Sequence, residues 1–135
     1  MTTLSGLSQA ISHVADVVGP SIVGVGRNGR GSGVVIADGQ VLTNAHNLRG
    51  QEVTITFADG RSTRGTVTGV DPDGDLAVVS VDTGGAKPIT WADDADGLSL
   101  GAAVFGAAAT VSGSPRVTFG LVSSVARAFR GPGGR

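Results

Sequence analysis

Two short segments place an imidazole and a carboxylate directly beside aliphatic runs. In TNAHN, residues 43–47, His46 follows a β-branched and aliphatic stretch, and in DGDLAVVSV, residues 73–81, Asp75 precedes one. A carboxylate can hold an imidazole in one tautomer and stabilise its charged form, and such an imidazole acts as a general base. His46 and Asp75 are therefore the candidates for acid–base chemistry.

Each candidate also has an ordinary structural explanation when it is taken singly. His46 fits a capping or surface role, and Asp75 fits a turn in the segment DPDGD. The other histidine, His13, lies beside Val14 in a helical pattern, which favours a structural or solvent-exposed role.

Other kinds of site are disfavoured by the pattern of residues. A helix–loop–helix calcium loop that begins at Asp71 needs glycine at its sixth position and glutamate at its twelfth, where Leu76 and Asp82 stand. The glycines of GRGSGVV precede a strand, whereas a dinucleotide fingerprint follows one and opens a helix. Cysteine is absent, which excludes a thiol nucleophile. We expect no cofactor and no metal.

Composition limits the partners of the chain. At 135 residues, with 40% hydrophobic and 16% charged residues, one folded domain is expected. The net charge is −1 and no basic stripe is present, so we expect no nucleic-acid partner. The start of the chain has no signal-peptide pattern, and no apolar run reaches the length of about 20 residues that a membrane span needs.

The elements that position the candidates are a helix followed by strands. Apolar residues recur at helical spacing over 4–18, and Gly19-Pro20 ends that pattern. From residue 21 onward, short Val-, Ile- and Thr-rich runs alternate with Gly, Asp and Asn clusters. IADGQVLT and FADGRST each place Asp-Gly between two runs, as in β-hairpins. About seven or eight strands at this spacing indicate a sandwich or a small barrel.

These motifs, taken in order, resemble the trypsin-like serine proteases, specifically the HtrA (Deg-type) branch. GSGVVIADGQVLTNAHNL is similar to the family's Gly-Ser-Gly strand, turn and histidine segment, and DGDLAVVSV to its Asp-Leu-Ala strand. ADDADGLSLGAAVFGAA is similar to the connection and strand that follow, and VTFGLVSSVAR to the strand that leads into the second barrel. The resemblance covers almost the whole chain.

The resemblance implies an all-β fold: an antiparallel β-barrel, the first barrel of a trypsin-like protease, with one N-terminal α-helix. The expected domains are a helix over 1–20, a single barrel over 21–126 and a basic, glycine-rich tail over 127–135.

The resemblance also assigns roles to residues. It makes His46 the general base and Asp75 its orienting carboxylate, while Ser32 in the Gly-Ser-Gly strand is not the nucleophile. Asn47 stands where the family often has an aliphatic residue or a cysteine.

The nucleophile is not found in the 135 residues. The family carries it in a Gly-Asn-Ser-Gly-Gly-Pro segment of the second barrel, and the oxyanion-hole amides flank it. The nearest cluster, VSGSP at 111–115, lacks that pattern and precedes VTFGLVS instead of following it. The resemblance thus implies the N-terminal half of a serine endopeptidase, inactive by itself and lacking the specificity pocket. The alternative is a natural single-barrel scaffold or binding protein with a vestigial dyad.

The expected partners follow from the same resemblance. They are the missing second protease barrel and, in the parent enzyme, a polypeptide substrate. The isolated barrel is expected to form a homo-oligomer. The chain as given is expected in the cytoplasm, although family members are often exported.

Overall fold

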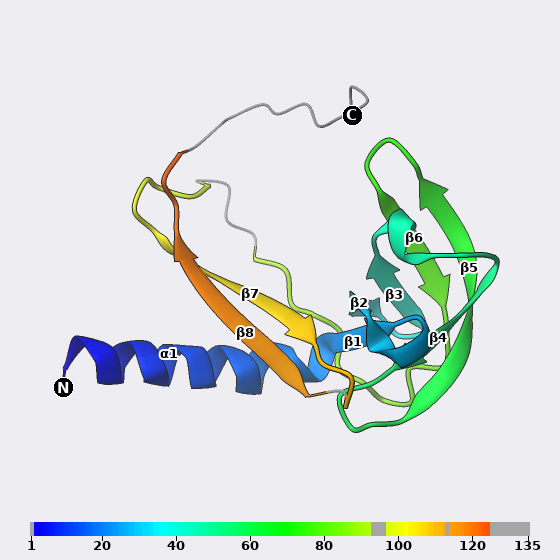
Figure 1. Ribbon diagram of the computed structural model, residues 1–135, viewed down its shortest axis with the longest axis horizontal. Helices are drawn as coiled ribbons and strands as arrows, with labels where there is room; N and C mark the ends of the chain where they lie inside the picture. The colour runs from blue at the N-terminus through cyan, green and yellow to red at the C-terminus, as the bar shows by residue number, and fades with distance from the viewer. Residues whose placement is uncertain (1, 93–96, 113, 125–135) are drawn as a thin grey trace.

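A closed six-stranded antiparallel barrel is the main feature of this computed structural model, which describes residues 2–92, 97–112 and 114–124 (Figure 1). The order around the barrel is β1-β2-β3-β6-β5-β4, and β4 pairs with β1 to close it. The expected fold class is confirmed. The strands are β1 (Ile22–Val25), β2 (Gly31–Ala37), β3 (Gln40–Thr43), β4 (Glu52–Thr56), β5 (Ser62–Asp71) and β6 (Leu76–Ser80).

Both Asp-Gly pairs form the tight turns that the sequence predicts. Gly39 joins β2 to β3 with a φ of 80°, and Gly60 joins β4 to β5 with a φ of 89°. Glycine adopts this left-handed backbone without steric cost, which explains its place after each aspartate. The turns fix the register of the two hairpins.

The barrel interior is filled largely by valine. The alternation in β4 continues into Phe57, so that Val53, Ile55 and Phe57 are 7%, 0% and 3% exposed. Burying a side chain of this size contributes roughly 1.5–3 kcal/mol, which makes this cluster the main source of stability. The cluster comprises Val23, Val25, Val35, Val41, Val53, Ile55, Phe57, Val79 and Val81.

The N-terminal helix α1 (Thr3–Val18) begins at a capping box. The Thr2 side chain accepts a hydrogen bond from the Ser5 amide at 3.1 Å, and the Ser5 hydroxyl accepts one from the Thr2 amide at 3.1 Å. Of the predicted apolar stripe, Leu4 is 75% exposed, because the first turn extends beyond the elements that cover the rest of the helix (Figure 1). The stripe is otherwise half-buried, at Leu7, Ile11, Val14 and Val18.

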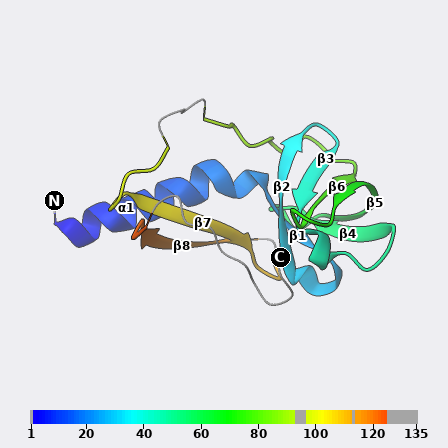
Figure 2. The same cartoon turned by 90° about the horizontal axis from the view of Figure 1, so that it is seen from above.

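The last two strands, β7 (Ala103–Ala109) and β8 (Pro115–Leu121), form a separate two-stranded sheet. They do not join the barrel, since pairing of β4 with β1 leaves no edge to which β7 could add. The hairpin instead lies along α1 and touches the barrel through β1 and β2 (Figures 1 and 2). The Ala109 amide donates to the Ser32 hydroxyl at 3.0 Å, which ties β7 to β2.

The division into a helix, a domain over 21–126 and a tail stays a prediction, and the tail at 127–135 lies outside the described residues. Within the part of the chain that the structure describes, none of the helices has the length and apolarity that a bilayer span requires.

Two glycines of β5 provide a matched test of the barrel interior. A Cβ on Gly65 would lie 2.5 Å from Val79 Cγ1, whereas a Cβ on Gly69 would meet nothing within 4 Å. We expect Gly65→Ala to lower the free energy of unfolding by about 1–3 kcal/mol through overpacking. Gly69→Ala should change it little. Urea unfolding measures both, and equal effects would contradict this packing.

Candidate active site

The pairing of β3 with β6 brings the two candidate residues together. The strands are antiparallel, with Thr43 opposite Ala77, so the end of β3 lies beside the start of β6. His46 follows β3 within the 3-10 turn η3 (Ala45–Asn47), and Asp75 directly precedes β6. The strand pairing therefore places them at the same rim of the barrel, although they are 29 positions apart in the chain.

The backbone of Asp75 is in the left-handed region, with a φ of 55°. Asp75 follows a tight turn in which the Gly74 amide donates a hydrogen bond to Asp71 Oδ1 at 3.1 Å. Aspartate is one of the few residues other than glycine that adopts this backbone conformation readily. Aspartate at this position therefore directs a carboxylate toward η3, whereas glycine, which also adopts this conformation, would provide no side chain.

Both carboxylate oxygens of Asp75 bind His46. Asp75 Oδ2 lies 2.5 Å from His46 Nδ1, and Asp75 Oδ1 accepts a hydrogen bond from the His46 amide at 2.9 Å. The Asp75 backbone carbonyl accepts further bonds from the Ala45 amide and the Asn44 side-chain amide, both at 3.1 Å. The histidine segment and the aspartate turn are therefore joined by four polar contacts.

The His46 ring and then the His46 amide lower the pKa of Asp75 below its ordinary value of 3.8, because both hydrogen bonds favour the charged carboxylate. A carboxyl group with a lowered pKa stabilises the fold above its ordinary pKa. This contribution is lost as the pH falls through the lowered value. The pair is thus intact at neutral pH.

The geometry leaves one ring nitrogen available. With Nδ1 against the carboxylate, Nδ1 carries the proton in the neutral ring and Nε2 points away from Asp75 as the free base. The side chains of His46 and Asp75 are 68% and 44% exposed, so a second molecule or chain segment can reach the imidazole. This arrangement can accept a proton from a hydroxyl placed at Nε2.

The serines that the sequence analysis considered lie elsewhere. The Ser32 hydroxyl is bound by the Ala109 amide at 3.0 Å. Ser112 and Ser114 lie near the turn of the β7–β8 hairpin, where the Ser112 hydroxyl contacts that of Thr110 at 3.1 Å. Within residues 2–92, 97–112 and 114–124, no serine hydroxyl is hydrogen-bonded to His46.

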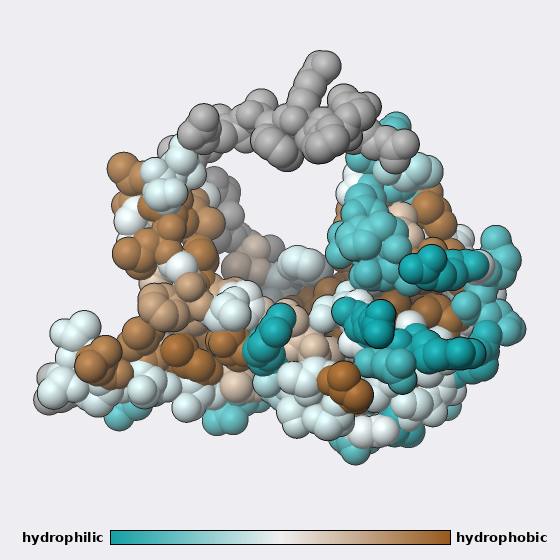
Figure 3. Space-filling view, in the orientation of Figure 1, coloured by the Kyte–Doolittle hydropathy of each residue, from teal (hydrophilic) through white to brown (hydrophobic). Residues whose placement is uncertain are grey.

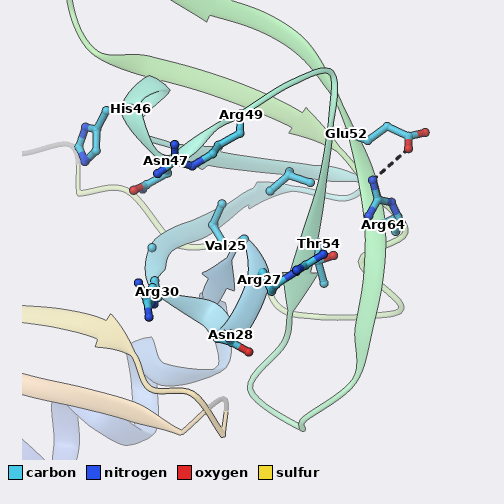
Figure 4. A pocket seen from close by; sticks show the side chains of 13 residues that line it. Val25, Arg27, Asn28, Arg30, His46, Asn47, Arg49, Glu52, Thr54 and Arg64 are labelled. Carbon is cyan, nitrogen blue, oxygen red and sulfur yellow. Dashed lines mark hydrogen bonds and ion pairs between the residues drawn. The ribbon is translucent and has the colours of Figure 1, made fainter.

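A pocket of about 680 Å3 opens beside His46 at the end of the barrel. Its lining includes the buried Val25 and Val53, which are 1% and 7% exposed. In Figure 4, His46 and Arg30 lie on one side of this pocket and the Glu52–Arg64 pair on the other. The cationic side chains that line it are Arg27, Arg30, Arg49 and Arg64.

Sequence reasoning missed these arginines and the supporting role of Asn44. The arginines come from the turn before β2, the loop after η3 and β5, at spacings that follow no motif. Only the closure of the barrel brings them to one rim. Asn44 belongs to TNAHN, the segment that contains His46, and this proximity in the sequence was the available signal.

Comparison with known proteins shows which family the chain belongs to. Residues 31–134 match the family described as trypsin-like peptidase domain. The chain is 34% identical to the serine protease PepD of Mycobacterium tuberculosis, over 87% of this chain and 29% of that protein. It is 30% identical to Protease Do-like 5, chloroplastic, of Arabidopsis thaliana, over 79% of this chain and 38% of that protein.

A similar structure is also known. The crystal structure of Deg5 superposes with a TM-score of 0.77 at 25% identity, covering 96% of this chain and 70% of that one. The chain spans well under half the length of the curated relatives named above, at 29% and 38%.

Replacing Asp75 tests the His46–Asp75 contact directly. In Asp75→Asn we expect the Nδ1–H tautomer of His46 to be less populated, because the charged group that accepts the Nδ1–H hydrogen bond is lost. Long-range 15N–1H NMR of the neutral His46 ring measures the tautomer. The wild-type chain should also lose stability relative to Asp75→Asn as the pH falls below 3.8. An unchanged tautomer in Asp75→Asn would show that the carboxylate does not orient the ring.

Proposed function

Because the chain belongs to the trypsin-like peptidase domain family, we propose that it carries the general base and the orienting carboxylate of a serine endopeptidase. The relatives of protease Do and Deg type fit the branch that the motifs predicted. In this proposal His46 is the base and Asp75 is its orienter.

The observation that carries the proposal is the two-point contact between Asp75 and His46. One carboxylate oxygen holds His46 Nδ1 at 2.5 Å and the other holds the His46 amide at 2.9 Å. A turn aspartate or a surface histidine has no need of this double contact. It fixes the ring and leaves Nε2 open, which is what a base that activates a hydroxyl requires.

The remaining parts of the reaction come from outside the described barrel in this proposal. A serine on a second barrel would transfer its proton to His46 Nε2 as it attacks the peptide carbonyl. Asp75 would stabilise the imidazolium that forms, and His46 would then return the proton to the leaving amine. Amides flanking that serine would bind the oxyanion.

The chain by itself should not hydrolyse peptides, because the family's Gly-Asn-Ser-Gly-Gly-Pro segment does not occur in its 135 residues. We expect no turnover of casein or a peptide ester by the pure chain. Within a longer protein that adds this segment, Asp75→Asn should lower kcat about 10⁴-fold. His46→Ala should lower it about 10⁶-fold.

His13→Ala is the matched control, since it removes the other histidine, which is exposed on α1. It should leave kcat unchanged in the longer protein. Turnover by the chain itself that survives purification and disappears in His46→Ala would contradict the proposal. So would full activity of His46→Ala in the longer protein.

We propose further that a partner covers the apolar side of the hairpin. Figure 3 shows hydrophobic surface over β7, β8 and α1 and mostly hydrophilic surface over the barrel. Phe119 and Leu121 of β8 are 52% and 66% exposed, and Leu98 and Leu100 before β7 are 61% and 68% exposed. In the parent enzyme the second barrel would cover this side, and in the isolated chain a second copy would do so.

Sedimentation at micromolar concentration tests this second proposal. The wild-type chain should sediment as a dimer. Phe119→Thr with Leu121→Thr should shift it toward monomer, because each removes apolar surface from the hairpin. Val70→Thr is the control, since Val70 is 54% exposed on β5 of the barrel. A monomeric wild-type chain, or an equal shift in the control, would contradict the proposal.

A further inference from the structure

Positive charge is concentrated at one pocket of a chain that is not basic. The net charge is −1, and of the ten Lys and Arg residues three lie at 127, 130 and 135, outside the described residues. Four of the remaining seven, all arginine, line the pocket beside His46.

Most of this charge is not neutralised by the fold. Arg64 pairs with Glu52 at 3.1 Å, and Glu52 is the one acidic residue among the described residues that line the pocket. Arg27, Arg30 and Arg49 form no salt bridge with another described residue. Three cations around one concave surface repel each other, and an anion in the pocket would relieve that repulsion.

We propose that this pocket binds the carboxylates of an acidic polypeptide segment. The segment would be the part of the substrate that flanks the bond presented to His46, so this inference rests on the proposed function. It adds a substrate class: polypeptides with Asp or Glu next to the site of cleavage.

The shape and chemistry of the pocket favour carboxylates on a peptide. The planar guanidinium group of arginine can donate two parallel hydrogen bonds to one carboxylate. Val25 and Val53 provide a buried apolar floor for the aliphatic part of a glutamate side chain. A volume of about 680 Å3 accepts several side chains, and His46 lines the same pocket, so a chain bound there passes the imidazole.

A nucleic acid fits these observations less well. Sequence-tolerant binding of single strands combines a basic groove with aromatic platforms on which bases stack. The described lining of the pocket contains no aromatic side chain. The arginines surround one pocket and do not follow a long stripe.

The experiment is a direct binding measurement on the chain itself, which does not depend on proteolysis. The probe is a fluorescein-labelled peptide of alternating Glu and Ala, compared by anisotropy with the same peptide carrying Gln for Glu. We expect the Glu peptide to bind at least tenfold more tightly at low salt. Its affinity should fall between 0.05 and 0.5 M NaCl as exposed charges are screened.

Substitution of the arginines locates the binding. Arg30→Gln and Arg49→Gln should each weaken binding of the Glu peptide about three- to fivefold, and the double variant about tenfold or more. All of these side chains are exposed, so the fold should persist, and circular dichroism checks it. Arg116→Gln is the matched control, because this exposed arginine lies on β8 and does not line the pocket.

Asp75→Asn separates this inference from the proposed function. Asp75 does not line the pocket, and Asp75→Asn removes a negative charge beside it, so this variant should bind the Glu peptide at least as tightly as the wild type even though it impairs catalysis in the longer protein. Equal affinity for the Glu and Gln peptides would overturn the inference. So would equal weakening by Arg116→Gln, or binding of inorganic phosphate or an oligonucleotide in place of the peptide.

Discussion

The antiparallel pairing of β3 with β6 is the constraint on which the whole site depends. It places the end of one strand beside the start of the other, and Thr43 and Ala77, which face each other there, are both buried. A shift of one residue would turn these side chains out of the core and move His46 away from Asp75. The same apolar burial that stabilises the barrel therefore fixes the geometry of the polar pair.

Solvent exposure of the His46 and Asp75 side chains limits the strength of their interaction when no partner covers them. The His46 and Asp75 side chains are 68% and 44% exposed, so water competes for their hydrogen bonds and weakens the attraction between their charges. Covering this rim with protein would exclude water and strengthen both interactions. The barrel thus provides orientation, and a covering element would provide the low dielectric that a reaction with charge separation needs.

Much of this arrangement could be predicted from the sequence because it is encoded locally. The Asp-Gly turns, the alternation of β4 and the strand-end positions of His46 and Asp75 are each visible within about ten residues. The separate β7–β8 sheet was not predicted, since it depends on closure of the barrel by β1 and β4. The arginine pocket was missed for the same reason: its residues share a rim and not a segment.

The residues that stabilise the barrel lie in other parts of the chain than the arginines that we propose bind a ligand. Valines from the strands fill the core, whereas Arg27, Arg30 and Arg49 lie in connecting segments and are exposed. Changes in such segments cost the core little, while loops on a rigid scaffold commonly carry binding residues. The His46–Asp75 pair belongs to both parts, because it lies in turns whose positions are set by β3 and β6. The connecting segments at this rim can therefore change while the His46–Asp75 pair stays in place.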